Sequence, residues 1–467
     1  MRSRLIVLTA CLAMLAAACG RSDGSTAVKP DTTPSNPATS SSTSGKDTNF
    51  GALKDVCTTG TPSGSPSTGV TSTEVRVATF SDSGFVGRPG LNQELFDTAD
   101  VFAAWCNDRG GINGRTIVVD KRDVALTNVK ARMTESCVDD FALVGGGATF
   151  DQDGVDTRLR CLLPDFAGFV VSAPARGADL LVQPLPNSLK SLQIGTLNYL
   201  TTRFPAATKK VGVLTGDLAT TKAVADQNAE GAKAIGWNIV YNDLYPVAGL
   251  ADWTPFAQKL KDSGVKGLIW VGEPEGLALL LHSLKDIGYS LDFVRVDANH
   301  YDQKLIDLGT DALDGNNVFI QSSFSPFEDA KPSNATGQYL QAFQDYLPTG
   351  KDRAYLGLQA WSAWLLFATV AKSCGNDLTR RCVYNAAKKI TAWTGGGLHA
   401  ATNPGQGVSS GCNLVEVATP KGFRLAPGQK PNDGIYQCSP KNVHRLTGDY
   451  GKGITLADVG ESIDHLE

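Results

Sequence analysis

Short apolar runs alternate with amphipathic segments along most of this chain, and this alternation limits its possible folds more than any other feature. The β-rich run 74–80 is followed by apolar residues at every third or fourth position, as in a helix: Leu91, Leu95, Ala99, Phe102 and Cys106. The same pattern predicts further strands at 116–120, 141–144, 168–171, 210–214, 267–271 and 293–296. Apolar strands separated by helices are typical of parallel sheets covered on both faces. The sequence therefore predicts an α/β fold.

The alternation falls into two blocks, at about 74–195 and about 196–325. A helical segment follows at 334–390, and a last strand candidate lies at 412–417. Doubly wound sheets of this kind bind ligands at the carboxyl ends of their strands. Two such Rossmann-like lobes facing each other would hold a small molecule in the cleft between them.

The N-terminal residues predict export and a membrane anchor. The apolar stretch from Leu5 to Ala18 follows two arginines and is too short to span a bilayer, which needs about 20 residues, so 1–18 is interpreted as a secretory signal peptide. Small residues before Cys19 resemble a bacterial lipobox, which makes Cys19 the expected lipidation site; ordinary signal cleavage beside an incidental cysteine is the alternative. The Ser-, Thr- and Pro-rich composition of 19–73 predicts a flexible tether.

The remaining cysteines fit an exported protein, because disulfides persist outside the cytosol. Without the signal peptide and Cys19, eight of the ten cysteines remain, and eight cysteines can pair in 105 ways. Proximity in sequence favours Cys137–Cys161, Cys374–Cys382 and Cys412–Cys438, which leaves Cys57 for Cys106. The sequence has no C-x-x-C motif and five histidines, so neither a metal nor a cofactor is expected.

Charge and motifs exclude several functions. The 43 basic and 47 acidic residues give a net charge of −4, which argues against nucleic acid as a partner. The sequence lacks a phosphate-binding P-loop, a zinc-protease H-E-x-x-H and a G-x-S-x-G nucleophile motif, so no enzymatic activity is expected. An exported hydrolase is a weaker alternative that the scarcity of histidine disfavours.

Residues 74–123 resemble a known family. With the run Asn-Asp-Arg-Gly-Gly-Ile-Asn-Gly-Arg at 107–115, this block is similar to the amino-terminal block of the periplasmic leucine/isoleucine/valine-binding family, and the order of blocks agrees along nearly all of 74–420. The resemblance implies a class I periplasmic-binding-protein fold, in which three crossovers near 195, 325 and 410 join the two lobes. It implies the following division: lobe one at 74–195 plus 326–410, lobe two at 196–325 plus 411–445, and a C-terminal tail at 446–467.

The same resemblance implies a role and partners. It predicts an extracytoplasmic receptor that captures a small-molecule solute by hinge closure and passes it to the membrane permease and ATPase of an ABC importer. With a lipid on Cys19, the protein would be held on the outer face of the cytoplasmic membrane. A solute sensor that signals to a membrane receptor is the alternative, and a purely structural envelope protein is a further one.

Binding residues carried over from the family lie in loops that follow the strands. In the family, backbone amides and hydroxyls of lobe one hold the head group of the solute, and acidic and aromatic side chains of lobe two complete the site. The corresponding residues here are Ser81, Gly146, Gly147, Ala148, Thr149, Ser172, Ala173, Thr221, Glu273, Asp297, Asn299 and Tyr355.

Each candidate also has a structural interpretation. The glycines could form a tight turn, Thr149 and Asp297 could cap helices, Ser172 could make a strand-end hydrogen bond, and Tyr355 could pack in the core. The family's amino-acid binders carry a serine-rich loop at the position of the glycine run, so a branched-chain amino acid is not the only candidate solute. Another amino acid, an amide or a small carboxylate fits equally well.

Overall fold

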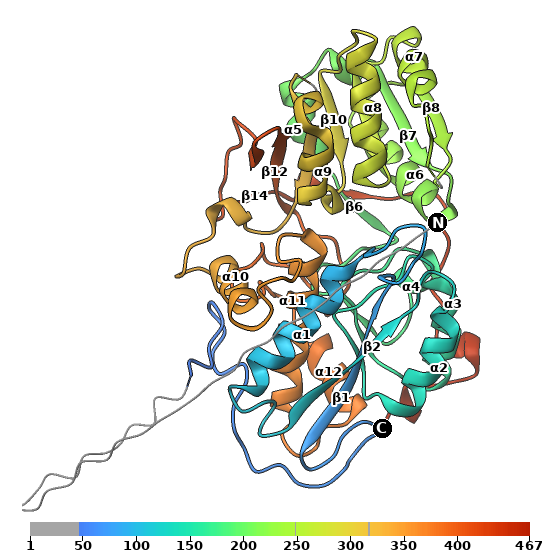
Figure 1. Ribbon diagram of the computed structural model, residues 1–467. Coiled ribbons are helices and arrows are strands. Elements are labelled where there is room, and N and C mark those ends of the chain that lie inside the picture. Colours follow the sequence, from blue (N-terminus) through green and yellow to red (C-terminus); the bar gives the residue numbers. More distant parts are fainter. Residues whose placement is uncertain (1–45, 248, 316–317) are drawn as a thin grey trace, which may run out of the picture. The chain divides into compact units, whose positions relative to one another are not determined.

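The first sheet contains five parallel strands in the order β2-β1-β3-β4-β5; its strands β1 and β2 are labelled in Figure 1. The structure, a computed structural model, describes residues 46–467 except 248 and 316–317. The strands are β1 (Glu74–Ser81), β2 (Thr116–Asp123), β3 (Leu143–Val144), β4 (Asp165–Phe166) and β5 (Leu181–Val182). The predicted signal peptide, the predicted lipidation site Cys19 and the first part of the predicted tether lie outside the described residues.

Helices cover both faces of this sheet. Successive residues of a strand point to opposite faces, so an apolar strand places side chains to be buried on both. Val75 and Val77 of β1 are buried with α1 (Gln93–Asn107) and α11 (Tyr355–Ser373). Phe80, on the other face of the same strand, is buried with α2 (Val129–Asp139). Further helices pack beside these: α3 (Gln152–Arg160) on α2, α10 (Ala335–Tyr346) on α1, and α12 (Arg380–Lys388) on α11. The sheet and these helices form lobe one.

The second sheet has the strand order β13-β12-β11-β10-β9-β7-β8. Its parallel part consists of β7 (Val211–Gly216), β8 (Ile239–Tyr245), β9 (Gly267–Val271), β10 (Phe293–Val296) and β11 (Val318–Ser322). The antiparallel strands β12 (Cys412–Thr419) and β13 (Gly422–Leu425) extend it beyond β11, and β14 (Gln437–Cys438) pairs with β12.

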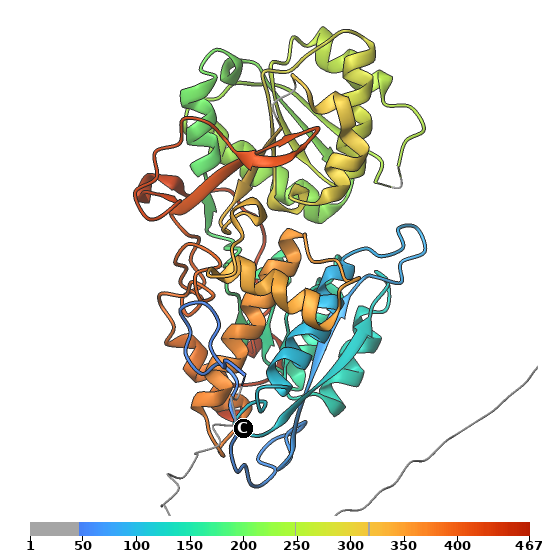
Figure 2. The same cartoon turned by 60° about the vertical axis from the view of Figure 1, so that its left-hand side comes forward.

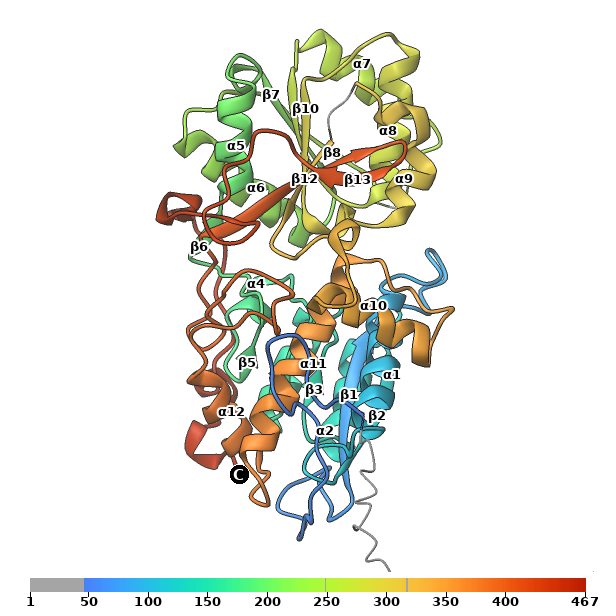
Figure 3. The ribbon, with the colours of Figure 1, turned by 90° about the vertical axis from the view of Figure 1, so that its left-hand side faces the viewer.

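Helices also cover both faces of the second sheet, as Figure 3 shows. Residues of α5 (Gly195–Arg203) and α6 (Ala219–Ala234) form one buried cluster with Val211 and Val213 of β7. On the opposite face, α7 (Thr254–Asp262), α8 (Pro274–Asp286) and α9 (Gln303–Gly309) bury side chains with Leu214, Leu268 and Trp270. The second sheet and these helices form lobe two. The predicted fold of two doubly wound α/β lobes is confirmed.

The chain passes between the lobes after β5, after β11 and before β12, near the expected crossings at 195, 325 and 410. At the junction, β6 (Ser191–Gln193) pairs with β15 (Val443–Arg445). The C-terminal segment then passes back once more. Leu456, Val459 and Leu466 are buried against α3, and the chain ends at lobe one (Figure 2).

Residues 46–73, which we call the N-terminal strap, differ from the predicted flexible tether. Phe50 is 1% exposed, and its ring lies 6.0 Å from that of Trp105 and 5.5 Å from that of Trp361. Cys57 forms a disulfide with Cys106 of α1. The Ser-, Thr- and Pro-rich composition predicts flexibility, but a few scattered apolar side chains and one cysteine are enough to fix this segment to lobe one.

Four disulfides are present within the described residues, with the pairing that proximity in sequence favours: Cys57–Cys106, Cys137–Cys161, Cys374–Cys382 and Cys412–Cys438.

The strand prediction at 168–171 is wrong, because the sheet strand is Asp165–Phe166 and the apolar run after it is a loop. In this loop Gly168 lies so close to the backbone of Gly145 and Gly146 that a Cβ would not fit. None of the helices in the described part of the chain has the length and apolar character needed to cross a membrane.

Candidate functional site

Two polar residues at the end of β1, the predicted Ser81 and its neighbour Asp82, are buried and fix loops of lobe one. Ser81 is fully buried, and its hydroxyl donates to the carbonyl of Asn92 at 2.8 Å. The next residue, Asp82, is also fully buried and accepts hydrogen bonds from the backbone N–H and the hydroxyl of Thr149, both at 2.8 Å, and from the N–H of Leu126 at 2.9 Å. Thr149 therefore binds a carboxylate of its own chain and does not cap a helix. Sequence reasoning missed Asp82, although a carboxylate directly after a strand was a usable signal.

The glycine run after β3 is required by close packing. Gly145 has a φ of +68°, and a Cβ at this position would collide with the ring of Trp364. A Cβ at Gly146 would collide with the backbone of Phe80, and one at Gly147 with the ring of Phe169. The N–H of Gly147 donates to the carbonyl of Phe80 at 3.1 Å, so this amide already has a partner. The next candidate, Ala148, is buried. These contacts account for the glycines without a ligand.

The loop after β4 is held by a second aspartate. Asp151 precedes α3, and its carboxylate accepts from the N–H groups of Val171 at 2.7 Å and Ser172 at 3.1 Å. Ser172 is the N-cap of the short helix α4 (Ala173–Arg176), and its hydroxyl accepts from the N–H of Ala175 at 3.3 Å. Burial raises the pKa of Asp151 to about 6. Ala173, also a candidate, is the first residue of this helix.

A cavity of about 40 Å³ lies behind these loops, between the sheet of lobe one and helices α2 to α4. Three ionisable side chains line it: Asp151, Arg158 and Asp165. Arg158 donates to backbone carbonyls, among them that of Leu163 at 3.0 Å. Burial raises the pKa of Asp165 to about 6, although the nearby Arg158 opposes the rise. The cavity thus combines apolar walls with a buried cluster of charges.

In lobe two, the carboxylates after β9 contact lobe one. Glu273 accepts from Nη1 of Arg88 at 2.6 Å, and Glu275 accepts from Nε at 2.8 Å and from Nη2 at 3.1 Å. Arg88 belongs to the loop between β1 and α1. Burial lowers the pKa of Arg88, but the two carboxylates outweigh this effect and the net pKa is raised. Lys304 of α9 also lies 2.7 Å from Glu275. No periodicity marks Arg88 in its turn-rich loop, so sequence reasoning missed it.

The residues after β10 are partly exposed and partly structural. Asp297 lies 2.7 Å from Nη1 of the buried Arg295, and 31% of its side chain is exposed. The amide of Asn299 donates to the carbonyl of Gly272 at 3.0 Å, and its oxygen lies 3.0 Å from Nδ1 of His300. His300 is fully buried, and burial lowers its pKa to about 4. Of this group, Asp297 offers the most accessible charge.

The last two candidates are packed within the protein. Thr221 lies in α6, and its hydroxyl donates to the carbonyl of Gly216 at 2.6 Å, which closes the turn after β7. Tyr355 is 6% exposed, and its ring lies edge-on to that of Phe324 at 5.0 Å. Tyr355 therefore lies in the core, as its structural interpretation predicted.

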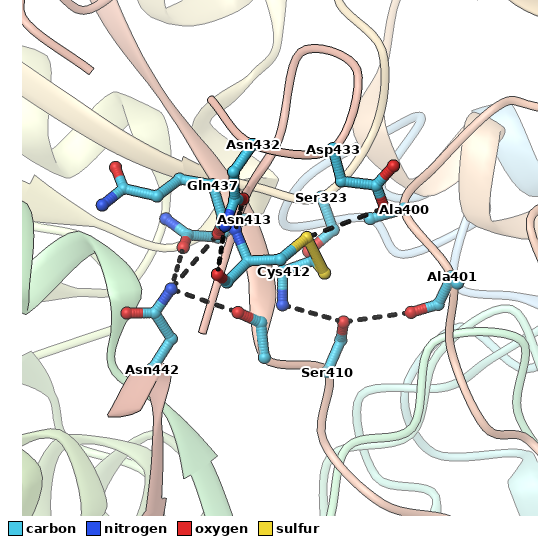
Figure 4. Close-up of a disulfide and its surroundings, with 12 residues drawn as sticks. Ser323, Ala400, Ala401, Ser410, Cys412, Asn413, Asn432, Asp433, Gln437 and Asn442 are labelled. Atoms are coloured by element: carbon cyan, nitrogen blue, oxygen red, sulfur yellow. Dashed lines mark hydrogen bonds between the residues drawn. A yellow bond between two sulfur atoms is a disulfide. The ribbon is translucent and has the colours of Figure 1, made fainter. Parts of the chain in front are cut away.

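Side chains brace the junction of the lobes around the disulfide Cys412–Cys438 (Figure 4). The amide of Gln193 donates to the carbonyl of Cys412 at 2.7 Å, and that of Asn442 donates to Oδ1 of Asn413 at 3.1 Å. The carboxylate of Asp433 lies near the two sulfurs. Because these sulfurs are bonded to each other, no thiolate is free, and the group does not form a metal site.

Two α/β lobes, each built on a mainly parallel sheet and joined by several chain crossings, define the class I periplasmic-binding-protein fold. The model of the family described as periplasmic binding protein matches residues 193–422. The predicted resemblance is thus confirmed: the matching family model and the similar solved structures are of periplasmic binding proteins, and this chain has their class I fold. No curated protein matches the sequence.

Solved structures with similar folds have low sequence identity to this chain. A fatty acid ABC transporter substrate-binding protein from Thermomonospora curvata is 15% identical with a TM-score of 0.65, over 83% of this chain and 97% of the other. A branched-chain amino acid ABC transporter from Thermus thermophilus with bound valine is also 15% identical, with a TM-score of 0.64 over 79% and 98%. A substrate-binding periplasmic protein from Ralstonia solanacearum is 20% identical, with a TM-score of 0.60 over 75% and 99%. At these identities the likeness is one of fold.

Proposed function

We propose that the chain is an extracytoplasmic receptor of an ABC importer that captures a small solute between its two lobes. One observation carries this proposal: loops that follow strands of both sheets meet, because Arg88 after β1 contacts Glu273 and Glu275 after β9. Strand ends that face each other are where doubly wound lobes bind ligands. A membrane permease and an ATPase are the proposed partners, and Cys19 is the proposed lipid anchor.

The proposed solute is an amino acid, an amide or a small carboxylate that lobe two recognises through its acidic groups. Glu273 and Asp297 have side chains that are 53% and 31% exposed, so both carboxylates are accessible to a ligand. In lobe one the hydroxyls of Ser81, Thr149 and Ser172 are engaged in internal bonds. We therefore assign the polar recognition mainly to lobe two.

Hinge closure is the proposed mechanism. A solute that contacts both lobes binds the closed form better than the open one and shifts the population toward it. The three crossings between the lobes would absorb the rotation. The permease would then distinguish the loaded receptor from the empty one by its shape. The same closed state docked on a membrane receptor would make the chain a sensor, and transport of the bound solute into cells would separate the two roles.

A thermal-shift screen of the purified full chain, with disulfides intact, tests the proposal. The library contains amino acids, amides, small carboxylates, fatty acids and sugars. A solute at 100 times its dissociation constant adds about 2.7 kcal/mol of stability, which is readily measured. A hit among the first three classes supports the proposal and names the solute class. A hit restricted to fatty acids or sugars would contradict the proposed solute, and no hit at all would contradict the receptor role.

A further inference from the structure

The loop between β1 and α1 forms an arm that carries Arg88 from lobe one to lobe two. Backbone hydrogen bonds brace this arm: the N–H of Phe85 donates to the carbonyl of Asp82 at 2.9 Å, and that of Arg88 donates to the carbonyl of Phe85 at 3.0 Å. Pro89 follows and fixes its own φ. The arm therefore holds Arg88 in place before it meets its partners.

All three guanidinium nitrogens of Arg88 contact carboxylates of lobe two. Three of its N–H donors reach two carboxylates, with a two-pronged contact to Glu275 and a single one to Glu273. The side chains of Arg88 and Glu275 are 23% and 27% exposed. Two-pronged arginine–carboxylate pairs are the stronger and more directional ion pairs in proteins. This contact is thus more than an ordinary surface ion pair.

A second cation of lobe one makes a parallel contact. Lys351, in the loop between α10 and α11, lies 3.1 Å from Glu94 of α1 and 2.7 Å from Asp302, the N-cap of α9 in lobe two. Its backbone N–H donates to Asp97 of α1 at 2.8 Å, which fixes it to lobe one. In both contacts lobe one supplies the cation and lobe two a carboxylate.

The Lys351 and Arg88 contacts differ in the backbone that surrounds them. Lys351 lies close to backbone pairing between the lobes, since Asp302 pairs with Ala354 and the N–H of Tyr355 donates to the carbonyl of Tyr301 at 3.3 Å. Arg88 reaches lobe two only through its arm. A rotation of the lobes can therefore break the Arg88 contact while the Lys351 contact persists.

We propose that Arg88, with Glu273 and Glu275, is an ionic clasp that holds the two lobes together in the absence of solute. Opening of the lobes for solute entry then requires the guanidinium to leave both carboxylates. The clasp goes beyond the proposed function, because it concerns the empty protein and does not depend on which solute binds. It makes the separation of the lobes sensitive to salt, since added ions screen charge pairs: the screening length falls from about 10 Å at 0.1 M to about 3 Å at 1 M.

A distance measurement on the solute-free full chain tests the clasp. A fluorescent donor and acceptor are placed with non-natural amino acids at Val138 in lobe one and Leu279 in lobe two, whose side chains are exposed and which lie outside the clasp. This labelling leaves the disulfides untouched. Arg88→Ala is expected to lower the energy transfer, because the lobes spend more time apart. Salt at about 1 M should shift the wild type toward the variant, and should leave the variant unchanged.

The matched control is Lys121→Ala. Lys121 lies 2.7 Å from Asp100, and both residues belong to lobe one, so removal of this exposed pair should leave the energy transfer at its wild-type value. If Arg88→Ala affects folding, as a loss of the cooperative melting transition would show, Glu275→Gln removes the two-pronged acceptor at nearly the same size. Equal energy transfer in wild type and the folded clasp variant, at low and high salt, would overturn the clasp.

The result is independent of the solute screen. Lowered energy transfer in Arg88→Ala without any hit in the screen would support the clasp and contradict the receptor role. A solute hit with unchanged energy transfer in the variant would support the receptor and contradict the clasp.

Discussion

The strand ends of the two lobes use their polar side chains in opposite ways. In lobe one, the carboxylates of Asp82 and Asp151 accept hydrogen bonds from N–H groups of neighbouring loops and tie these loops together. In lobe two, Glu273 and Glu275 project from the start of α8, and their partner Arg88 comes from the other lobe. The strand-end carboxylates of lobe one therefore form a structural framework within their own lobe. Those of lobe two form a responsive surface, because they are available to the other lobe or to a ligand.

This difference shows that position at a strand end does not by itself identify a ligand contact. The same topological place can hold a loop together or face a partner. Burial separates the two cases here: Asp82 is fully buried, whereas 53% of the Glu273 side chain is exposed. The predictions below test whether the framework and the responsive surface can be changed independently.

The largest effect is expected for Asp82→Ala. This change leaves the N–H groups of Leu126 and Thr149 and the hydroxyl of Thr149 without their acceptor in a buried place. We expect a loss of about 3 kcal/mol in the free energy of unfolding, measured by denaturant titration. Asp100→Ala is the control, because its side chain is exposed and should cost little. An equally small loss in both variants would show that lobe one does not depend on this carboxylate.

The fold could be predicted from the sequence because the spacing of apolar residues follows from the geometry of strands and helices. The turn-forming glycines and the apolar runs placed β1, β7, β9 and β10 within a residue or two. The strand β4 was misplaced because the run Gly168 to Val171 is more apolar than the true strand, Asp165–Phe166. Local composition cannot show which of two neighbouring runs finds hydrogen-bonding partners.

The candidate site was harder to predict. The sequence located the loops that follow the strands, but not the direction or the partners of their side chains. Ser81, Thr149 and Thr221 have hydroxyls at or just after strand ends, as expected, yet each is bound to its own lobe. Arg88 was missed because its contact joins residues 185 and 187 positions apart, and no local pattern records such a pairing.

The second largest effect concerns pH and the buried charges of lobe one. The pKa of Asp165 rises from 3.8 to about 6 on folding. Well below pH 3.8 the carboxyl is mostly protonated in both states, but between about pH 4 and 6 the unfolded chain has released the proton and the folded protein retains it. This aspartate therefore lowers the stability as the pH rises through that window, by about 3 kcal/mol at most.

Asp165→Asn should remove this contribution, and the free energy of unfolding should then fall less steeply from pH 4 to 6 than in the wild type. Asp156→Asn is the matched control, because Asp156 is an exposed aspartate of α3 that pairs with Arg160. Its slope should equal that of the wild type. A slope that is unchanged in Asp165→Asn would place the titrating group elsewhere.

A smaller effect on the free energy is expected for the acidic residues of lobe two, and it should appear in binding. For any solute that the screen identifies, Glu273→Ala should weaken affinity at least tenfold, about 1.4 kcal/mol, with the melting temperature nearly unchanged. Asp297 is better replaced by Asn, which removes the charge but keeps a hydrogen-bond acceptor for the buried Arg295, whereas Ala would remove both.

Titration calorimetry on both variants distinguishes two roles. A loss of affinity in both places the solute on the acidic groups. A change in Glu273→Ala alone would assign the effect to the clasp with Arg88. Wild-type affinity in both variants would remove these carboxylates from the site.

The smallest effect is expected for Ser172→Ala, which tests the framework at a residue that was also a ligand candidate. The hydroxyl caps α4, so its removal should cost about 1 kcal/mol of stability. Solute affinity should stay within twofold of the wild type, because the hydroxyl is directed at Ala175. Thr379→Ala is the control for the loss of a helix cap, since the Thr379 hydroxyl caps α12 by accepting from the N–H of Cys382 at 3.2 Å. A fall in affinity for Ser172→Ala without a loss of stability would instead make Ser172 a solute contact, and lobe one would then share in recognition.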